Sequence, residues 1–288
     1  MTPSVAVVIP AHDAAPFLEV ALQSLQHQTL PLAEVVVVDD GSTDGTHQIA
    51  ERLGVRCIRQ VQRGPAAARN AGIAATKAPL IAFLDADDWF DPHKLQKQVH
   101  KLEELGASAV CCNAWVVIGD RVTRRKNEEH QVPSVLTMER LLLGNPVICS
   151  TMLARREAVQ QAGGFDEDPV LIATEDYDLW LRMARREPLA YLQEPLAFYR
   201  VHPGSLSGNT RFLQGIDRVM DKWLPTFGQE PHFRGLMERR RGTVRLELAW
   251  DLLREGHRAE ARAMLAQARQ HCGVTWRGCK MWLRSMLG

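Results

Sequence analysis

Short apolar runs alternate with helical patterns along the first third of the chain. Three runs rich in Val, Ile and Leu are typical of strands buried on both faces: 5–9, 34–39 and 80–84. The run at 55–59 predicts a further strand. Apolar residues spaced three or four apart predict a helix after each run: 16–28, 44–53, 66–76 and 93–105. This alternation with short connections predicts an open, mostly parallel, Rossmann-like sheet covered by helices on both faces.

The pattern changes along the second half of the chain. Residues 107–150 are irregular and predict strands and loops that complete the sheet, whereas no strand pattern follows residue 210. Two amphipathic helices are expected at 243–255 and 259–271, joined at Gly256. We therefore predict an α/β domain over residues 1–210 and a small α-helical appendage over residues 211–288.

Composition excludes several classes of protein. The 288 residues are 45% hydrophobic and 24% charged, which is typical of a folded globular chain. No apolar run approaches the roughly 20 residues of a membrane span. The six cysteines form no Cys-x-x-Cys pair, so we expect a cytoplasmic chain with reduced thiols, without structural zinc. The net charge of +1 and the lack of a binding motif argue against nucleic-acid partners.

Three polar clusters follow predicted strands at the points where the strands end. Ala-His-Asp follows the first strand at 11–13, Asp-Asp-Gly-Ser follows the second at 39–42, and Asp-Ala-Asp-Asp follows the fourth at 85–88. Ligands of such sheets bind at the carboxyl ends of the strands. We therefore expect the three clusters to meet at one edge of the sheet.

The cluster at 85–88 places three carboxylates within four residues, at Asp85, Asp87 and Asp88. Their mutual repulsion is costly unless a cation compensates it. Mg²⁺ or Mn²⁺ bound together with a diphosphate would do so. An acidic turn or helix start explains the same residues without a ligand.

The cluster at 39–42 has both a structural and a functional interpretation. A turn with a helix N-cap accounts for the residues after Asp40, but not for two adjacent aspartates that end a hydrophobic strand. A carboxylate there can accept hydrogen bonds from a nucleobase or a ribose. Arg69, at the start of the next helix, would contact a diphosphate or hold an aspartate of the 85–88 cluster. A surface ion pair is the alternative for Arg69.

A further acidic cluster, Thr-Glu-Asp-Tyr-Asp-Leu-Trp-Leu-Arg, begins a predicted helix at 174–182. Acidic residues in a first turn favour the helix dipole, so this cluster needs no catalytic role. The functional interpretation makes Asp176 a general base beside an acceptor hydroxyl.

Five motifs occur together and in a fixed order: Pro-Ala-His-Asp at 10–13, Val-Val-Asp-Asp-Gly-Ser-Thr-Asp-Gly-Thr at 37–46, Gly-x-x-x-Ala-Arg-Asn-x-Gly at 64–72, Phe-Leu-Asp-Ala-Asp-Asp at 83–88, and Gly-Gly-Phe-Asp with Glu-Asp-Tyr-Asp-Leu-Trp-Leu-Arg at 163–182. In order and spacing they resemble the family-2 inverting glycosyltransferases of the GT-A fold. The resemblance covers residue 4 to about residue 208.

The resemblance implies transfer of a sugar, with inversion, from a nucleotide-diphospho-sugar to an acceptor hydroxyl. A hexose from a UDP-sugar, used in cell-surface polysaccharide, lipopolysaccharide or glycolipid assembly, is the expected case. Carried over by position, the backbone of Pro10 and Ala11 and the carboxylate of Asp40 hold the nucleoside. Arg69 and the Asp-x-Asp residue Asp85 then belong to the donor site.

The resemblance also assigns the metal and the base. Asp87, which also belongs to the donor site, would bind Mn²⁺ or Mg²⁺ together with Asp88, and His202 in the segment at 199–207 would reach the metal or the diphosphate. Asp176 would be the catalytic base, and Glu175 would tune the acceptor pocket. For His202, a loop histidine held only by hydrogen bonds is the alternative.

Two other function classes stay open on the sequence alone. A sugar nucleotidyltransferase has a similar sheet, but it needs a glycine-rich loop after the first strand, and none is present. A catalytically inactive nucleotide-sugar-binding or scaffold module would not need Asp85, Asp87, Asp88 and Asp176 together. The chain lacks a Gln-x-x-Arg-Trp motif, so we expect a single transfer per encounter rather than processive synthesis.

Charge is distributed unevenly between the two regions. Residues 1–210 carry 20 basic and 26 acidic groups, whereas residues 211–288 carry 15 and 8, or −6 against +7. Cations alternate with Trp, Met and Leu at 276–287, which suits a lipid headgroup region. Peripheral contact with the inner face of a membrane, near a lipid-linked acceptor, is one interpretation. Packing of an ordinary C-terminal helix is the other, and a sugar or protein acceptor also stays open.

Overall fold

The computed structural model describes residues 4–128, 132–205 and 210–286, which fall into two compact units. We call them the sheet unit and the helical unit. The sheet unit takes the described residues of 1–138, 145–169 and 175–205. The helical unit takes 139–144, 170–174 and the described residues of 206–288. Two short segments of the helical unit thus come from the first 175 residues.

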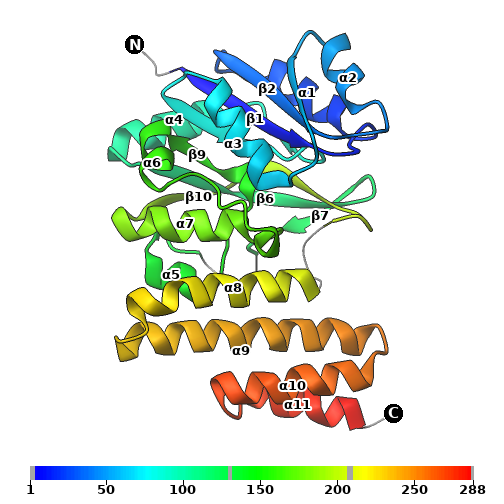
Figure 1. Cartoon of the computed structure of the whole chain (residues 1–288), viewed down its shortest axis with the longest axis vertical. Coiled ribbons are helices and arrows are strands. Elements are labelled where there is room, and N and C mark those ends of the chain that lie inside the picture. The colour runs from blue at the N-terminus through cyan, green and yellow to red at the C-terminus, as the bar shows by residue number, and fades with distance from the viewer. Residues whose placement is uncertain (1–3, 129–131, 206–209, 287–288) are drawn as a thin grey trace. The chain divides into compact units, whose positions relative to one another are not determined.

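Ten strands make up one sheet in the sheet unit (Figure 1). They are β1 (Val5–Ala11), β2 (Glu34–Asp40), β3 (Arg56–Gln60), β4 (Leu80–Phe83), β5 (Trp89–Phe90), β6 (Ala109–Ile118), β7 (Arg121–Arg125), β8 (Val135–Leu136), β9 (Leu153–Arg155) and β10 (Leu189–Val201). Their order is β3-β2-β1-β4-β9-β6-β10-β5, with β7 paired to β6 and β8 paired to β10.

Most of the central pairings in this sheet are parallel. Strands β3, β2, β1 and β4 form one parallel group and β6 and β10 form another, and β9 runs antiparallel between them. The predicted α/β class with a mostly parallel open sheet is therefore confirmed. Strands β1 to β4 are the four predicted strands. Those nearest the centre are apolar on both faces because both faces are covered, and Val5 to Ile9 are completely buried.

Six helices belong to the sheet unit: α1 (Leu18–Gln26), α2 (Thr46–Arg52), α3 (Pro65–Ala75), α4 (Lys94–Leu105), α6 (Arg156–Gln161) and α7 (Glu175–Arg186). Close packing of α3 on β1 depends on Gly72. A Cβ atom at this position would lie 2.3 Å from Cγ1 of Val8. Glycine therefore lets α3 lie directly on the strand, and this places the first turns of α3 near the carboxyl ends of β1 and β2.

The helical unit contains α8 (Thr210–Phe227), α9 (Pro231–Arg254), α10 (Arg258–Cys272) and α11 (Trp276–Met286), and it includes most of α5 (Met138–Leu143). No strand follows Val201 in the residues that the structure describes. The predicted helical appendage is confirmed, although α9 begins twelve residues before the expected start at Thr243. The basic stretch at 234–241 has few apolar residues and conceals the helical pattern. The core of this unit consists of Leu246, Ala249, Leu265, Ala268 and Met281.

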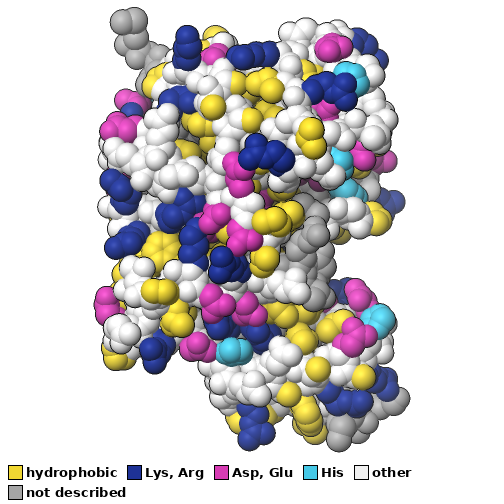
Figure 2. All heavy atoms as spheres, viewed as in Figure 1, with side chains coloured by type: hydrophobic (Ala, Val, Ile, Leu, Met, Phe, Trp, Pro, Cys, Tyr) yellow, Lys and Arg dark blue, Asp and Glu magenta, His cyan; other side chains and the backbone are white. Residues whose placement is uncertain are grey.

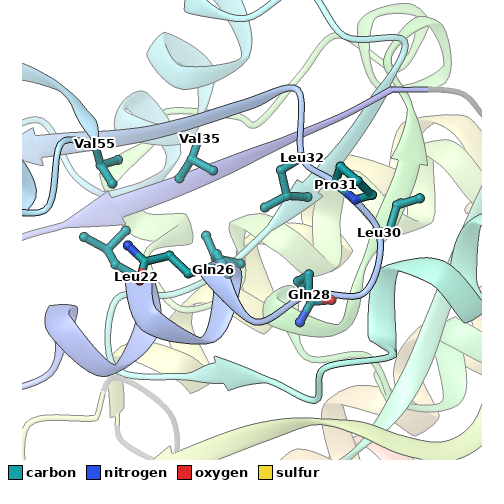
Figure 3. Close-up of a pocket in the computed structure, with 9 residues that line it drawn as sticks. Leu22, Gln26, Gln28, Leu30, Pro31, Leu32, Val35 and Val55 are labelled. Carbon is teal, nitrogen blue, oxygen red and sulfur yellow. The ribbon is translucent and has the colours of Figure 1, made fainter.

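An apolar cavity of about 280 Å³ lies beside the last turns of α1 (Figure 3). Leu22 and Leu25 of α1, the connection at 30–32 and Val35 of β2 line it, together with Val55. Val35 lies near the amino-terminal end of β2, and none of the lining residues belongs to the three polar clusters.

Candidate active site

Hydrogen bonds join the polar clusters that follow β1 and β2. Nδ1 of His12 lies 2.9 Å from the carbonyl oxygen of Asp40. The amide of Asp13 donates to Oγ of Ser42 at 3.0 Å, and the amide of Thr43 donates to Oδ1 of Asp13 at 2.8 Å. The carboxyl ends of the two strands therefore form one continuous edge, with Pro10 and Ala11 in β1 beside β2.

Asp40 organises the loop that leads into α3. Its Oδ1 accepts hydrogen bonds from the side chain of Gln60 at 2.7 Å and from the amide of Arg63 at 2.8 Å, and its Oδ2 accepts from the amide of Gly64 at 2.7 Å. The residue is 4% exposed. A carboxylate accepts about four hydrogen bonds, so Oδ2 retains capacity for a further donor. Asp40 thus fixes the loop at 60–64 next to the carboxyl end of β2.

Arg69 connects three elements of the sheet unit. Its Nη2 pairs with Oδ1 of Asp85 at 2.7 Å, and its Nη1 pairs with Oε1 of Glu175 at 2.6 Å. The guanidinium also lies over the ring of Phe165, 5.2 Å from its centroid. Burial alone lowers the pKa of Arg69, but Cys149, Asp85 and Glu175 outweigh it and hold the pKa well above the usual range. The structure thus pairs Arg69 with Asp85 of the 85–88 cluster, and a contact between Arg69 and a diphosphate stays a prediction.

Asp87 and His202 form the exposed part of the 85–88 cluster. Nε2 of His202 lies 3.0 Å from Oδ2 of Asp87, and about a quarter of each side chain is exposed. Burial, and then the charge of Asp85, raises the pKa of Asp87. The ring of Phe17 packs against the imidazole of His202, with the centroids 4.9 Å apart.

Asp88 points away from this pair into the protein. Its Oδ2 accepts a hydrogen bond from Oγ of Ser150 at 2.6 Å, and its Oδ1 accepts from the amide of Arg200 at 2.9 Å. The residue is 1% exposed, and burial, followed by the charges of Asp87 and Asp85, raises its pKa well above the usual range. The structure therefore places Asp88 as an anchor for the loop, apart from the exposed Asp87–His202 pair.

These side chains fit a divalent cation that brings part of its own coordination sphere. Among residues 4–128, 132–205 and 210–286, no three His, Cys, Asp or Glu side chains form a cluster that could hold a metal alone. Asp87 and His202 supply one carboxylate and one imidazole. Mg²⁺ is held in many proteins by one or two carboxylates plus substrate phosphates and water. The pair suits such a shared site, which needs a phosphate-bearing ligand.

The first turn of α7 places two carboxylates next to this network. The apolar face of α7 packs on the sheet through Trp180, whose ring centroid lies 6.1 Å from those of Phe83 and Phe165. This packing sets Glu175 beside Arg69, and Oε2 of Glu175 is buried without a hydrogen-bond partner among the described residues.

Asp176 differs from its neighbour Glu175. Asp176 keeps part of its surface exposed, and its Oδ1 accepts a hydrogen bond from the amide of Tyr177 at 2.6 Å. Burial raises the pKa of Asp176 to about 7; the charge of Glu175 adds to this effect and Arg69 opposes it. A carboxylate with this pKa can take up a proton near neutral pH.

Two residues of the site were assigned no role from the sequence, although Arg200 lies in the segment at 199–207 that resembles the family. Ser150 accepts a hydrogen bond from the amide of Asp85 at 3.0 Å while it donates to Asp88, so it holds both ends of the 85–88 cluster. It lies in the short 3₁₀ helix Cys149–Thr151, within a stretch that carries no recognisable pattern. Arg200 of β10 donates from Nε to the carbonyl oxygen of Asp87 at 3.0 Å. Both contacts join segments more than 60 residues apart in sequence.

Comparison with known proteins places the chain and its fold among sugar-transferring enzymes. The model of the family "Glycosyl transferase family 2" matches residues 6–163. The Bacillus subtilis (strain 168) protein "Uncharacterized glycosyltransferase EpsJ" is 31% identical over 229 residues, which are 72% of this chain and 64% of EpsJ. The chain thus covers just under two thirds of that relative.

A further relative has a named reaction. The Escherichia coli protein "UDP-Glc:alpha-D-GlcNAc-diphosphoundecaprenol beta-1,3-glucosyltransferase WfaP" is 28% identical over 210 residues, which are 71% of this chain and 80% of WfaP.

Solved structures agree with this chain in fold. Staphylococcus aureus TarS 1–349 in complex with UDP-GlcNAc superposes with a TM-score of 0.66 at 17% identity and covers 94% of this chain and 89% of its own. The Pyrobaculum calidifontis mannosyltransferase PcManGT in complex with GDP-Man and Mn²⁺ superposes with a TM-score of 0.63 at 20% identity, over 100% and 81%. The predicted GT-A fold is confirmed.

The described residues contain no helix with the length and apolar character needed to span a bilayer. The family model covers more than half of the chain, and it contains four of the five motifs that suggested the family. The chain belongs to glycosyl transferase family 2.

Proposed function

We propose that this glycosyltransferase moves a sugar from a UDP-sugar to an acceptor hydroxyl with inversion, in the assembly of a cell-surface polysaccharide or glycolipid. The observation that carries the proposal is Asp176, a carboxyl group of pKa about 7 held beside the Arg69–Glu175 pair. UDP-sugars are the donors named for WfaP and in the TarS complex. WfaP also acts on a lipid diphosphate, which supports an envelope pathway.

The two acidic residues at the start of α7 have different roles in this proposal. Asp176 accepts the acceptor proton as the acceptor oxygen forms its bond to the anomeric carbon. The bond from that carbon to the diphosphate oxygen breaks on the opposite face, and the diphosphate leaves with the electron pair, so one displacement inverts the centre. Glu175 already pairs with Arg69 at 2.6 Å, and it positions α7 and raises the basicity of Asp176.

The donor occupies the edge formed by β1, β2 and the 85–88 cluster. The backbone at Pro10 and Ala11 and the remaining acceptor capacity of Asp40 bind the nucleoside. Asp87 and His202 would hold Mn²⁺ or Mg²⁺ together with the diphosphate, and PcManGT was solved with Mn²⁺ beside its donor. When bound, the metal neutralises charge on the leaving diphosphate.

A screen of purified protein tests the donor, the metal and the base together. Thermal shifts and donor hydrolysis would be measured with UDP-, GDP-, CMP- and dTDP-sugars in Mn²⁺, Mg²⁺ or EDTA, because a bound ligand stabilises the folded state. We expect a UDP-sugar to stabilise the wild type in metal, Asp87→Ala to lose that shift, and Asp176→Asn to keep it without turnover.

Asp178→Asn is the matched control for this screen, since Asp178 is another acidic residue in α7, is buried and pairs with Arg182 at 2.8 Å. It should retain turnover at temperatures where it stays folded. Absence of any nucleotide-sugar shift in the wild type would contradict the proposal and favour an inactive scaffold.

We also propose that the helical unit contacts an anionic membrane next to a lipid-linked acceptor. Residues 261–288 contain five basic residues and no acidic residue. Val274, Trp282 and Leu283 are 69%, 41% and 60% exposed, and Lys280 is exposed on the same helix as the last two. Figure 2 shows Lys and Arg side chains beside hydrophobic ones at its lower end. Apolar side chains among cations suit an anionic lipid surface.

Vesicle flotation tests the membrane contact. The full chain should float with vesicles rich in phosphatidylglycerol and not with phosphatidylcholine alone, and Leu283→Asp should reduce flotation. Val61→Asp is the matched control, because Val61 is 85% exposed in the sheet unit. Equal flotation of both variants, or loss of a dimer instead of flotation in Leu283→Asp, would contradict the membrane contact.

A further inference from the structure

The backbone is strained shortly before the first turn of α7. Ala173 has a φ of +80°, which lies in the left-handed region that favours glycine. Among the described residues, Asp13 is the other non-glycine residue with a positive φ, and its carboxylate accepts a hydrogen bond from the amide of Thr43. Ala173 has no polar side chain that could offset the strain in this way. Its conformation is therefore held by the residues around it.

Ala173 lies inside a tight turn of residues 171–174. The amide of Thr174 donates to the carbonyl oxygen of Leu171 at 2.7 Å, and Oγ1 of Thr174 donates to the same oxygen at 3.0 Å. Both residues are buried. A φ near +80° at the third position is the pattern of a type II turn, where glycine or asparagine is usual. The strained alanine thus lies between two fixed ends.

Gly215 of α8 leaves no free space beside Thr174. A Cβ atom at position 215 would lie 2.2 Å from Oγ1 of Thr174 and 2.9 Å from its Cγ2. Residues 170–174 and α8 both belong to the helical unit, so this contact lies within one unit. Glycine at 215 therefore lets Thr174 pack directly on the backbone of α8, and this packing holds the end of the turn.

The turn leads directly into the residues of the proposed chemistry. Helix α7 begins at Glu175, the residue after Thr174, and Asp176 follows it. Glu175 is fixed by its pair with Arg69 at 2.6 Å. A rotation of the backbone at Ala173 would change the direction in which the chain enters α7. The placement of Asp176 thus depends on the turn as well as on the Arg69 pair.

We propose that the turn at 171–174 positions Asp176, with Ala173 setting the direction in which α7 begins and Gly215 holding Thr174 in place. This inference rests on the proposed role of Asp176 as the base. The positioning residues act through the backbone that carries Asp176. A base must lie within hydrogen-bond distance of the acceptor hydroxyl, and a displacement of about 1 Å can lower a rate about 10²-fold. The helical unit then contributes to turnover without supplying a catalytic side chain.

Gly215→Ala in the full chain tests the contact between α8 and the turn. The added methyl group forces Thr174 to move, so we expect kcat for sugar transfer to fall on the order of 10- to 100-fold. The Kd for UDP should change less than twofold, because the proposed nucleoside contacts lie in β1 and β2. Steady-state transfer at saturating substrates and calorimetric titration of UDP measure the two quantities.

A matched control and a compensating variant accompany Gly215→Ala. Gly235 also lies within a helix of the helical unit, but it is exposed and a Cβ atom there would have no neighbour within 4 Å. Gly235→Ala should therefore keep the kcat and the UDP affinity of the wild type. Thr174→Ala in the Gly215→Ala background removes the two atoms nearest the new methyl group and should restore part of kcat.

Ala173→Gly separates positioning from stability. Glycine adopts a φ of +80° without strain, so the thermal midpoint should not fall. The turn gains freedom, and we expect a loss in kcat that is smaller than in Gly215→Ala, without a loss of UDP affinity. A merely structural turn would change the thermal midpoint and leave kcat as it is.

Several outcomes would overturn the positioning role. They are a wild-type kcat in Gly215→Ala at temperatures where it is folded, an equal loss in Gly235→Ala, and parallel losses of kcat and UDP affinity. If Gly215→Ala does not fold, Ala173→Gly decides, and an unchanged kcat there would overturn the inference. Absence of transfer by the wild type would instead overturn the proposed function.

Discussion

Two parts of the same sheet edge differ in how many protein partners their carboxylates have. At the end of β2, Asp39 is satisfied by the amide of Ser42 and by Arg59, and Asp40 is satisfied by three donors from residues 60–64. We call this part the β2 edge. Its acidic residues have partners within the chain, and Oδ2 of Asp40 retains capacity for one further donor.

The other part, which we call the β4 edge, holds five carboxyl groups for one paired arginine. They are Asp85, Asp87, Asp88, Glu175 and Asp176. Arg69 compensates two of them, and the pKa values of Asp87, Asp88 and Asp176 are raised by burial and by the neighbouring charges. In the proposed function, this excess of poorly compensated carboxylates is where a cation would bind and where a proton would be accepted.

Asp176→Asn should produce the largest effect at the β4 edge. Removal of a general base costs about 10²- to 10⁴-fold in rate, because the acceptor proton then has no destination in the site. We expect kcat to fall by this factor while the Kd for UDP changes less than twofold, as measured by steady-state transfer and titration. A variant that retains wild-type turnover would show that Asp176 is not the base.

Arg69→Met tests whether the β4 edge depends on a single cation. The substitution leaves Asp85 and Glu175 partly or fully buried without their partner, and breaking a buried pair costs about 3–5 kcal/mol in the free energy of unfolding. Urea denaturation would measure this loss. Arg63→Met is the control, because Arg63 pairs with Glu167 in an exposed pair, a type that contributes about 0–1 kcal/mol. Similar losses in the two variants would contradict a special role for Arg69.

The contrast between the two edges was only partly predictable from the sequence. Strand ends are local features, because an apolar run followed by acidic residues is visible in the sequence, and the convergence of the runs at 5–9, 34–39 and 80–84 follows from parallel pairing. The start of α7 with its Glu175–Asp176 pair was predictable too, because it is a local pattern. Roles for these acidic residues could be proposed only from the resemblance to a family.

The partners of these acidic residues were not predictable, because they come from distant segments without a pattern of their own. Asp88 could not be distinguished from Asp87 in the sequence, and only the contacts with Ser150 and Arg200 turn it into the protein. The early start of α9 was concealed because its first half is basic and needs few buried residues. Local patterns predict elements, whereas tertiary contacts decide which carboxylate stays available.

Asp40→Asn examines the β2 edge, where we expect a smaller effect. An amide in place of the carboxylate weakens the charge-assisted bonds from Arg63 and Gly64, which contribute about 1.5–3 kcal/mol when the acceptor is ionised. The free energy of unfolding should fall by about 1–3 kcal/mol, with a loss of UDP affinity because the loop before α3 shifts. Asp120→Asn, at an exposed turn, is the control, and an equal change there would contradict the structural role of Asp40.

The pH dependence of Asp176 provides the most specific test, because stability and activity should move in opposite directions. Its folded-state pKa of about 7 lies above the ordinary aspartate value of 3.8. Between these values the folded protein holds a proton that the unfolded chain does not, so stability falls as pH rises to about 7 and then levels off. The slope is at most about 1.4 kcal/mol per pH unit.

Activity should follow the opposite course, because the base must be deprotonated. We expect kcat/KM, which reports the free enzyme, to rise up to tenfold per pH unit below pH 7 and to reach a plateau above it. Asp176→Asn cannot titrate, so its stability advantage over the wild type should grow from pH 5 to pH 7 and stay constant beyond it. Other groups titrate in both proteins and cancel in this difference. A pH-independent difference in stability would place the rate-controlling group elsewhere, and it would remove the reason for regarding the β4 edge as the reactive half of the site.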